Sequence, residues 1–555
     1  MKKKDLFYKI SSLPAMVILI LLFLIPLTGT LSKAFIVEGH FSFQQIIACL
    51  LDSYNLRVMA FTVKQAFLST LLSLIIGFPG AYLLAKFNFR GKKAFRSLCT
   101  IPFILPSILV VLGFVIFYGN NGFLNNLLMS IFHLSNPPLK ILYSFTAVLL
   151  AHSFYNFPII INFVSNQWEL LSDHPEKAAA TLGSKPIKTF FKITLPRLMP
   201  SIISSCSLIF LYCFTSFAII LVLGGGPKFT TIEVEIYNLA KRRMDIGGAA
   251  SLSIFSLIVS MLLLIIYLHF QKKATNQEVL LRPSNIKKTT SSKLKKILII
   301  FYIVLLLFFI LAPIISIFAR SFITASSRAD QIKSFTFNSY KEIFLPNQSV
   351  RIISSSTQAI INSLILAFVS SITSTILALG LCIGIKHKSS FFTELLVMLP
   401  MAVSSVIIGL GYLIIGRYFN SNFFFFLIVL AHTVIILPFA IKSLLPIYRS
   451  IPSSLTNASQ LFGYSPFRTF FNVELPLLKN AIITSLSFSF SLSLGEMNAT
   501  LILSNSKFVT IPTLIYRMIN SYYFQGACAL GSLLIIICFI LFYFSQAIGR
   551  TNLAK

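Results

Sequence analysis

The chain has 555 residues, of which 56% are hydrophobic and only 11% are charged. Because roughly a quarter of the residues in an ordinary soluble domain are charged, this composition excludes a large water-soluble globular protein. Lys and Arg total 46 against 15 Asp and Glu, and the resulting net charge of +31 is also typical of proteins that bind nucleic acid.

Twelve apolar runs follow one another along the chain, each near the roughly 20 residues that a helix needs to cross a bilayer. Runs such as 297–317 have no polar face, whereas buried helices of a soluble protein would show amphipathic stripes. The expected spans are 14–31, 61–85, 98–117, 141–163, 202–223, 249–270, 297–318, 358–385, 395–415, 423–441, 482–503 and 527–544. We therefore predict an all-α membrane protein with about 12 transmembrane helices.

The basic residues are concentrated on one side of the predicted spans. With the N-terminus in the cytoplasm, the cytoplasmic segments hold 30 of the 46 Lys and Arg residues. This distribution follows the positive-inside rule, so we expect both termini to be cytoplasmic. The excess of basic residues is therefore explained by the orientation of the chain in the membrane, and it should also attract anionic membrane lipid. We expect no nucleic-acid binding. The basic start at 2–4 resembles a secretory signal, but eleven further spans follow, so we expect an uncleaved first helix.

The chain repeats itself on either side of a polar segment. Matching residues lie 280 positions apart: His152 and His432, Gly183 and Gly463, Pro196 and Pro476. Such a register indicates an internal duplication. We predict an N-terminal permease half of six spans (1–270), a cytoplasmic linker (271–296) and a homologous C-terminal half of six spans (297–555). Because each half has an even number of spans, both have the same orientation and should enclose a pathway between them.

The most informative repeat is the loop between spans four and five, which recurs between spans ten and eleven. Alanines favour a short helix, a Gly suits its left-handed cap, and a Pro suits the first turn of a second helix. A pair of Phe residues then lies on one face, and the Pro of a Leu-Pro is expected to end this helix before the next span. The first copy contains Glu176, Ala178, Ala179, Gly183, Pro186, Phe190, Phe191, Leu195 and Pro196. The second contains Ala458, Gly463, Pro466, Phe470, Phe471, Leu475 and Pro476.

Both copies resemble the EAA motif of the inner-membrane components of binding-protein-dependent ABC importers. They keep the Gly and the hydrophobic-x-Leu-Pro ending, but the acidic position falls on Lys177, with Glu176 one residue early, and on Asn457. The resemblance implies that each loop is a coupling helix that docks on a cytoplasmic ABC ATPase homodimer, and that an extracytoplasmic solute-binding protein delivers the substrate. Since the acidic position is displaced, we expect docking to rely on the Phe-rich faces.

The chain has no GxxxxGK[ST] phosphate loop. We therefore expect a transport subunit that is not itself an enzyme and binds no cofactor, with ATP and Mg²⁺ held by the partner ATPase.

The fused twelve-span arrangement resembles the permeases of the iron(III) and thiamine importer branch. The stretches that carry this likeness are 118–122, 149–158, 216–218, 223–227, 230–233, 493–496 and 508–512. The resemblance implies a multi-pass permease of the bacterial inner membrane for a small solute, and the first-half pattern favours thiamine over iron(III).

The pathway should carry the few polar groups at membrane depth. Glu496 is the clearest ionisable residue inside a span, and burial of a charge in lipid is costly, so it should face a cavity or a partner. A carboxylate there would suit a cationic solute; a structural Glu bonded to a neighbouring Ser or Asn is the alternative. His152 and His432 lack further ligands at metal spacing, so we expect interhelical hydrogen bonds and no metal. Asn156 is the fourth pathway candidate.

Two other classes of protein share some of these features. An ion-coupled secondary transporter could also have a duplicated six-span fold, but it needs titratable residues within its spans, and these are nearly absent apart from Glu496. A membrane enzyme would need convergent His, Asp or Cys groups, and none cluster in the sequence.

Overall fold

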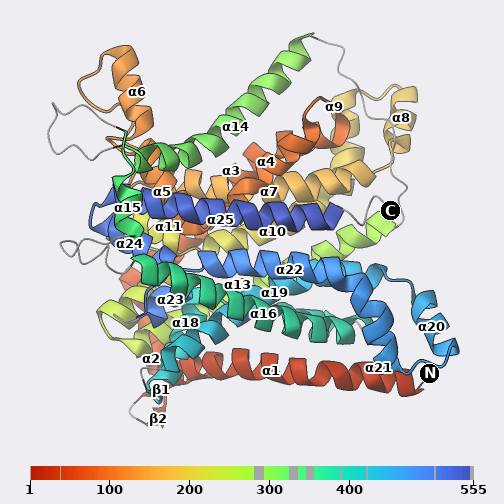
Figure 1. Ribbon diagram of the computed structural model, residues 1–555. Helices are drawn as coiled ribbons and strands as arrows, with labels where there is room; N and C mark the ends of the chain where they lie inside the picture. Colours follow the sequence, from red (N-terminus) through yellow and green to blue (C-terminus); the bar gives the residue numbers. More distant parts are fainter. Residues whose placement is uncertain are drawn as a thin grey trace.

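The apolar runs fold into long helices that lie side by side, with their ends gathered at two opposite faces of the bundle (Figure 1). This computed structural model describes residues 2–37, 39–279, 293–323, 335–344, 356–387, 391–420, 423–504 and 508–550. Within these residues, eleven helices are long and apolar enough to cross a membrane, or twelve if one bent pair counts as a single span. The predicted all-α membrane fold is therefore confirmed.

The long helices, the broken spans and the repeated loops occur in the same order in the two halves. The first half contains α1 (Lys2–Phe35), β1 (Ile36–Val37), β2 (His40–Phe41), α2 (Gln44–Leu51), α3 (Ser53–Lys86), α4 (Lys92–Ile104), α5 (Ser107–Tyr118), α6 (Phe123–Phe132), α7 (Phe145–Leu170), α8 (His174–Thr181), α9 (Pro186–Thr189), η1 (Phe190–Thr194), α10 (Leu195–Phe214), α11 (Ala218–Leu223), η2 (Pro227–Phe229), α12 (Ile232–Tyr237), η3 (Asn238–Arg242) and α13 (Ile246–Val279). The second contains α14 (Lys293–Ser321), α15 (Asn338–Phe344), α16 (Ser356–His387), α17 (Phe391–Ala402), α18 (Ser405–Gly416), α19 (Phe424–Ser450), α20 (Ser453–Leu461), α21 (Pro466–Thr469), η6 (Phe470–Glu474), α22 (Leu475–Gly495), α23 (Asn498–Leu503), α24 (Ile511–Asn520) and α25 (Phe524–Arg550).

The predicted linker, 271–296, begins inside α13 and ends inside α14. Its central part, 280–292, lies outside the described residues. The antiparallel pair β1–β2 follows the first span, at the end of the bundle opposite α8 and α20 (Figure 1).

Four of the expected spans are divided into two helices. The breaks separate α4 from α5, α10 from α11, α17 from α18, and α22 from α23. At the first break, Pro106 has no N–H to continue the helix and disfavours a helical conformation at Leu105. At the third, α17 and α18 are bent by 87°. Hydropathy alone predicted continuous spans because apolar residues run through the breaks.

The first helix of each half packs against the other half. Helix α1 contacts α16 and α18, and α14 contacts α4 and α5. A tyrosine hydrogen bond crosses between the halves at each of these two places. Tyr412 on α18 donates a hydrogen bond to the backbone oxygen of Leu22 on α1, and Tyr302 on α14 donates one to that of Ile76 on α3, both at 2.7 Å. The two halves are therefore interlocked through their first spans.

Glycines make these exchanged contacts close. A Cβ on Gly411 of α18 would meet the Pro26 carbonyl of α1, and a Cβ on Gly113 of α5 would meet the Pro313 carbonyl of α14 at 3.0 Å. Because the obstructing atoms are backbone, neither contact can be relieved by a change of side-chain rotamer.

We expect Gly411→Ala to lower the free energy of unfolding by about 1–3 kcal/mol, since the added methyl group forces α1 and α18 apart. Gly29→Ala on α1 is the matched control. A Cβ there has nothing within 4 Å, and removing a helical glycine should be neutral or stabilise by up to about 1 kcal/mol. Thermal unfolding of the purified protein in detergent measures both effects. Equal midpoints for the two variants would contradict the interlocked arrangement.

Candidate functional site: a central cavity and two terminal feet

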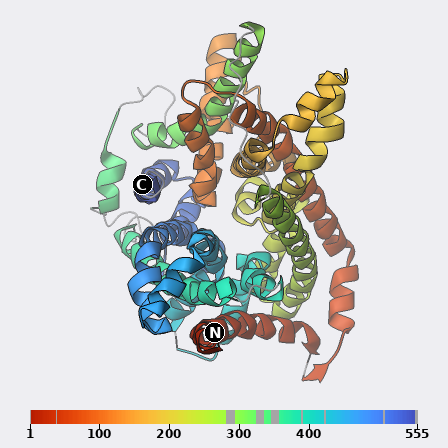
Figure 2. The same cartoon turned by 90° about the vertical axis from the view of Figure 1, so that its right-hand side faces the viewer.

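The two repeated loops lie at one end of the bundle. Helices α8 and α9 with η1 form the first foot, residues 174–194, and α20 and α21 with η6 form the second foot, residues 453–474. Figure 2 views the bundle from this end, where the chain also begins and ends. The duplication therefore places two similar protrusions and both termini on one face.

The turn inside each foot has the predicted geometry. Gly183 and Gly463 have φ angles of 77° and 83°, in the left-handed region that favours glycine. In the first foot, the N–H groups of Gly183 and Ser184 donate to carbonyls of the preceding helix at 3.0 and 2.9 Å, which closes a Schellman-type cap. Pro186 and Pro466 begin the second short helices, where a missing N–H leaves no bond unmade.

The prediction that the Leu-Pro pair ends the second short helix is wrong. No non-helical residue separates α9 from α10 or α21 from α22, because a π-helical turn, η1 or η6, joins each pair. The Leu195 N–H bonds to the Phe190 oxygen, five residues back. This wider turn accommodates Pro196, which in a regular α-helix would clash with the carbonyl four residues earlier. Each foot therefore continues without interruption into a membrane span.

The predicted single Phe face is also wrong. Phe190 turns inward and packs against Phe78 and Trp168, and Phe470 is buried. The outward surface has a different apolar set. Its exposed members are Leu182, Ile187 and Phe191 in the first foot and Leu455, Leu461, Phe462, Tyr464, Phe467 and Phe471 in the second.

A cavity of about 220 Å³ lies between the two halves at the depth of the four helix breaks. Residues from all four breaks line it: Leu105, Pro106, Thr215, Ser216, Phe217, Val403, Ser404, Gly495 and Glu496. Aromatic side chains complete the wall: Phe103, Tyr155, Tyr212 and Phe439. Non-helical backbone at membrane depth is tolerated where it lines such a cavity or is buried in protein.

Side chains satisfy the backbone groups that the breaks leave free. Gln65 donates to the carbonyl of Cys213 near the end of α10, at 2.7 Å. Ser404 accepts from the Ile407 N–H at the start of α18, at 3.2 Å. Glu496 accepts from the Ala499 N–H at the start of α23, at 2.9 Å. Each supplies a bond that an uninterrupted helix would have made.

Three of the four predicted pathway residues lie on the cavity wall: Glu496, His152 and Asn156. His152 bridges Ser69 and Ser216 at 3.2 and 2.8 Å. His432 is not on the wall; it bridges Ser493 and Thr500, both at 2.8 Å. These are interhelical hydrogen bonds of the kind expected for the two histidines. Among the described residues, no group of three or more His, Cys, Asp and Glu side chains could hold a metal ion.

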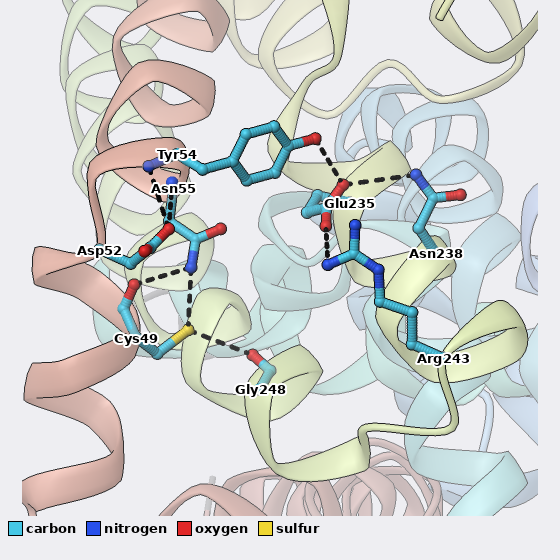
Figure 3. Close-up of polar contacts among 8 residues, drawn as sticks. All are labelled: Cys49, Asp52, Tyr54, Asn55, Glu235, Asn238, Arg243 and Gly248. Carbon is cyan, nitrogen blue, oxygen red and sulfur yellow. Dashed lines mark hydrogen bonds and ion pairs between the residues drawn. The ribbon is translucent and has the colours of Figure 1, made fainter. Parts of the chain in front are cut away.

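Two buried carboxylates were not among the predicted site residues, because their segment lies between the expected spans 202–223 and 249–270. Glu233 accepts hydrogen bonds from Ser256 at 2.8 Å and from Ser404 of the other half. Glu235 accepts from Tyr54 at 3.1 Å and Asn238 at 3.3 Å and forms an ion pair with Arg243 at 3.4 Å (Figure 3). The pattern Ile-Glu-Val-Glu in a short apolar helix was the available signal. These carboxylates join α12 to α3, α13 and α18.

The same region contains a protected cysteine. Cys49 lies in α2, outside the spans, and its thiol contacts the Gly248 carbonyl (Figure 3). Burial, and then the nearby Asp245 carboxylate, raises the pKa of Cys49 to about 11. The thiol is therefore protonated and unreactive at neutral pH.

Comparison with known proteins gives one consistent result. Thiamine transport system permease protein ThiP of Brucella abortus (strain 2308) is 27% identical over 499 residues, covering 88% of this chain and 87% of the relative. The ThiP protein of Escherichia coli (strain K12) is 26% identical over 91% of each chain. Ferric transport system permease protein FbpB of Actinobacillus pleuropneumoniae is 24% identical over 98% of this chain and 79% of the relative.

The family match falls on two segments, residues 69–276 and 376–552, one in each half of the chain. These segments contain the two feet and most of the cavity wall. This chain belongs to the family described as binding-protein-dependent transport system inner membrane component.

Proposed function

We propose that the chain forms the translocation pathway of an ATP-driven importer, and that the central cavity binds a small cationic solute during transport. The observation that carries this proposal is the convergence of four broken spans on one cavity between the halves. A pathway between two similar halves allows the cavity to open alternately to either side by rocking of the halves.

The chemistry of the cavity favours thiamine as the solute. Thiamine carries a cationic thiazolium ring, and aromatic faces attract such cations by about 0.5–2 kcal/mol each. The wall offers five aromatic rings, Phe103, Tyr155, Tyr212, Phe217 and Phe439, beside the carboxylate of Glu496. A bare ferric ion would instead need several hard oxygen ligands, and Glu496 is the only carboxylate among the described cavity-lining residues. The names of the ThiP relatives support the same choice.

The feet are proposed as the docking surfaces for a homodimeric cytoplasmic ABC ATPase. Both feet expose large apolar side chains, with Leu182 and Leu461 88% and 89% exposed. Contiguous exposed apolar groups at the tip of a membrane protein mark a protein–protein interface. On this proposal, the ATPase holds ATP and Mg²⁺, both termini are cytoplasmic, and a solute-binding protein docks at the opposite face.

For the solute, we expect Glu496→Gln to reduce thiamine uptake about tenfold, which corresponds to the loss of about 1.4 kcal/mol of attraction for a cation. The amide oxygen can still accept from the Ala499 N–H, so the start of α23 should remain capped. Glu233→Gln is the matched control, because Glu233 is a second carboxylate between the halves but is fully buried and does not line the cavity. Uptake is measured in proteoliposomes with the cognate binding protein and ATPase. Unchanged thiamine uptake, or transport of ferric ion instead, would contradict the proposed solute.

For docking, we expect Phe191→Ser combined with Phe462→Ser to reduce the ATPase that copurifies with the tagged permease at least tenfold, since each buried interface Phe contributes about 2 kcal/mol. Phe132→Ser is the control: it is 65% exposed, close to the 60% of Phe191, but lies on α6 at the opposite end. An ion-coupled transporter would show no copurified ATPase even in the parent protein. Full retention of the ATPase by the double variant would overturn the docking role of the feet.

A further inference from the structure

A lysine at the end of the second span contacts the foot in both halves. Lys86 ends α3, and its Nζ lies 2.7 Å from Asp173 Oδ1 and 3.1 Å from Glu176 Oε2, beside and within the first foot. Lys386, next to the end of α16, lies 3.6 Å from Glu474 Oε1 of the second foot. All of these side chains are at least three-quarters buried, and Glu474 is fully buried.

The two carboxylates occupy different places in the repeat. At the constant spacing of 280, Glu176 corresponds to Thr456, and Glu474 corresponds to Thr194. Both feet therefore have one Glu and one Thr at these two positions, but the Glu comes first in the first foot and second in the second foot. In the first foot these positions are in contact, because Thr194 Oγ1 donates to Glu176 Oε1 at 2.8 Å. A carboxylate on either position is thus within reach of the lysine.

The residue at a third matching position supports the carboxylate in the second half. Tyr448 donates to Glu474 Oε2 at 2.8 Å, and Lys386 Nζ lies 4.2 Å from the centre of its ring. The corresponding residue in the first half is Trp168, whose Nε1 is buried without a hydrogen-bond acceptor among the described residues. The first half therefore has an N–H donor at the position from which Tyr448 supports Glu474 in the second half.

The helices that carry these lysines also extend to the far end of the bundle, and α3 contacts the cavity wall on the way. Along α3, Gln65 bonds to the Cys213 carbonyl at the break between α10 and α11, and Ser69 contacts His152 on the cavity wall. Farther along, Thr62 accepts from the Ile232 N–H of α12 at 3.0 Å. On α16, Ser363 accepts in the same way from the Ile511 N–H of α24 at 2.8 Å. Each second span thus joins its foot to the far end of the bundle.

We propose that Lys86 and Lys386 fasten each foot to the second span of its half and transmit movement of the foot to the pathway. They act as positioning residues, and either carboxylate position can complete the fastening. The transmitting role rests on the proposed docking of an ATPase at the feet, whereas the fastening itself does not. The second foot has Thr456 in place of Glu176, and the missing carboxylate is therefore compensated eighteen residues later, at Glu474.

The fastening is tested on the purified chain alone by hydrogen exchange of the foot peptides, 174–194 and 453–474. We expect Glu176→Thr and Lys86→Met to speed exchange in the first foot at least tenfold. The double variant Glu176→Thr with Thr194→Glu should restore the parent exchange rate in the first foot. In the second foot, Glu474→Thr alone should speed exchange, and adding Thr456→Glu should restore the parent rate. Glu169→Thr is the matched control, because its ion pairs with Lys92 and Arg96 lie on the same side but do not involve the feet.

The transmitting role is tested with ATPase and binding protein added. We expect Glu176→Thr to move several-fold less solute for each ATP that is hydrolysed, and the exchanged pair to recover this ratio. Exchanged pairs that remain as impaired as the single variants at equal thermal midpoints would overturn the proposal. Restored hydrogen exchange with an unaffected transport ratio in Glu176→Thr would overturn the transmitting role. If the parent protein binds no ATPase, the proposed docking is contradicted. The hydrogen-exchange measurement still tests whether Lys86 and Lys386 hold the feet to the second spans.

Discussion

A helix that breaks inside a membrane leaves backbone N–H and C=O groups that lipid cannot satisfy, and this constraint organises the pathway. All four breaks meet at the interface between the halves, where side chains supply the missing bonds. Gln65 and Glu496 bond to the free backbone groups, and Glu496 also lines the cavity. Some of the polar side chains that line the pathway therefore also stabilise the broken spans, by bonding to their free backbone groups. A structural role and a transport role for Glu496 are compatible.

Duplication gives each half the same parts, and the exchange of first spans makes the halves depend on one another. Because α1 packs on α16 and α18, and α14 packs on α4 and α5, neither half can move without carrying a helix of the other. The feet continue directly into α10 and α22, whose far ends are the breaks at the cavity. Movement applied at one end of the bundle thus has a continuous helical route to the pathway in both halves.

The sequence was sufficient for the class of fold, the duplication and the turn chemistry of the feet, because these follow from hydropathy, spacing and the needs of Gly183 and Pro186. It could not predict the breaks, since apolar residues continue through them and bilayer length alone predicts whole spans. The π-turn was missed because proline normally ends a helix, and here a wider turn absorbs Pro196. The repeat alone could not predict the carboxylate of the second foot, because Thr456 takes the place of Glu176 there and Glu474 takes the place of Thr194.

The central claim is that a solute passes through the cavity formed by the four breaks. The most direct measurement is labelling of Ser405→Cys, on the cavity wall, by a membrane-impermeant cationic thiol reagent during turnover. Ser374→Cys, which is buried in α16 away from the cavity, and the parent protein are the controls. The account predicts that Ser405→Cys is labelled only while the transporter turns over, that labelling stops uptake, and that solute slows it. Complete labelling with uptake unchanged, or no labelling at any stage of turnover, would contradict a pathway through this cavity.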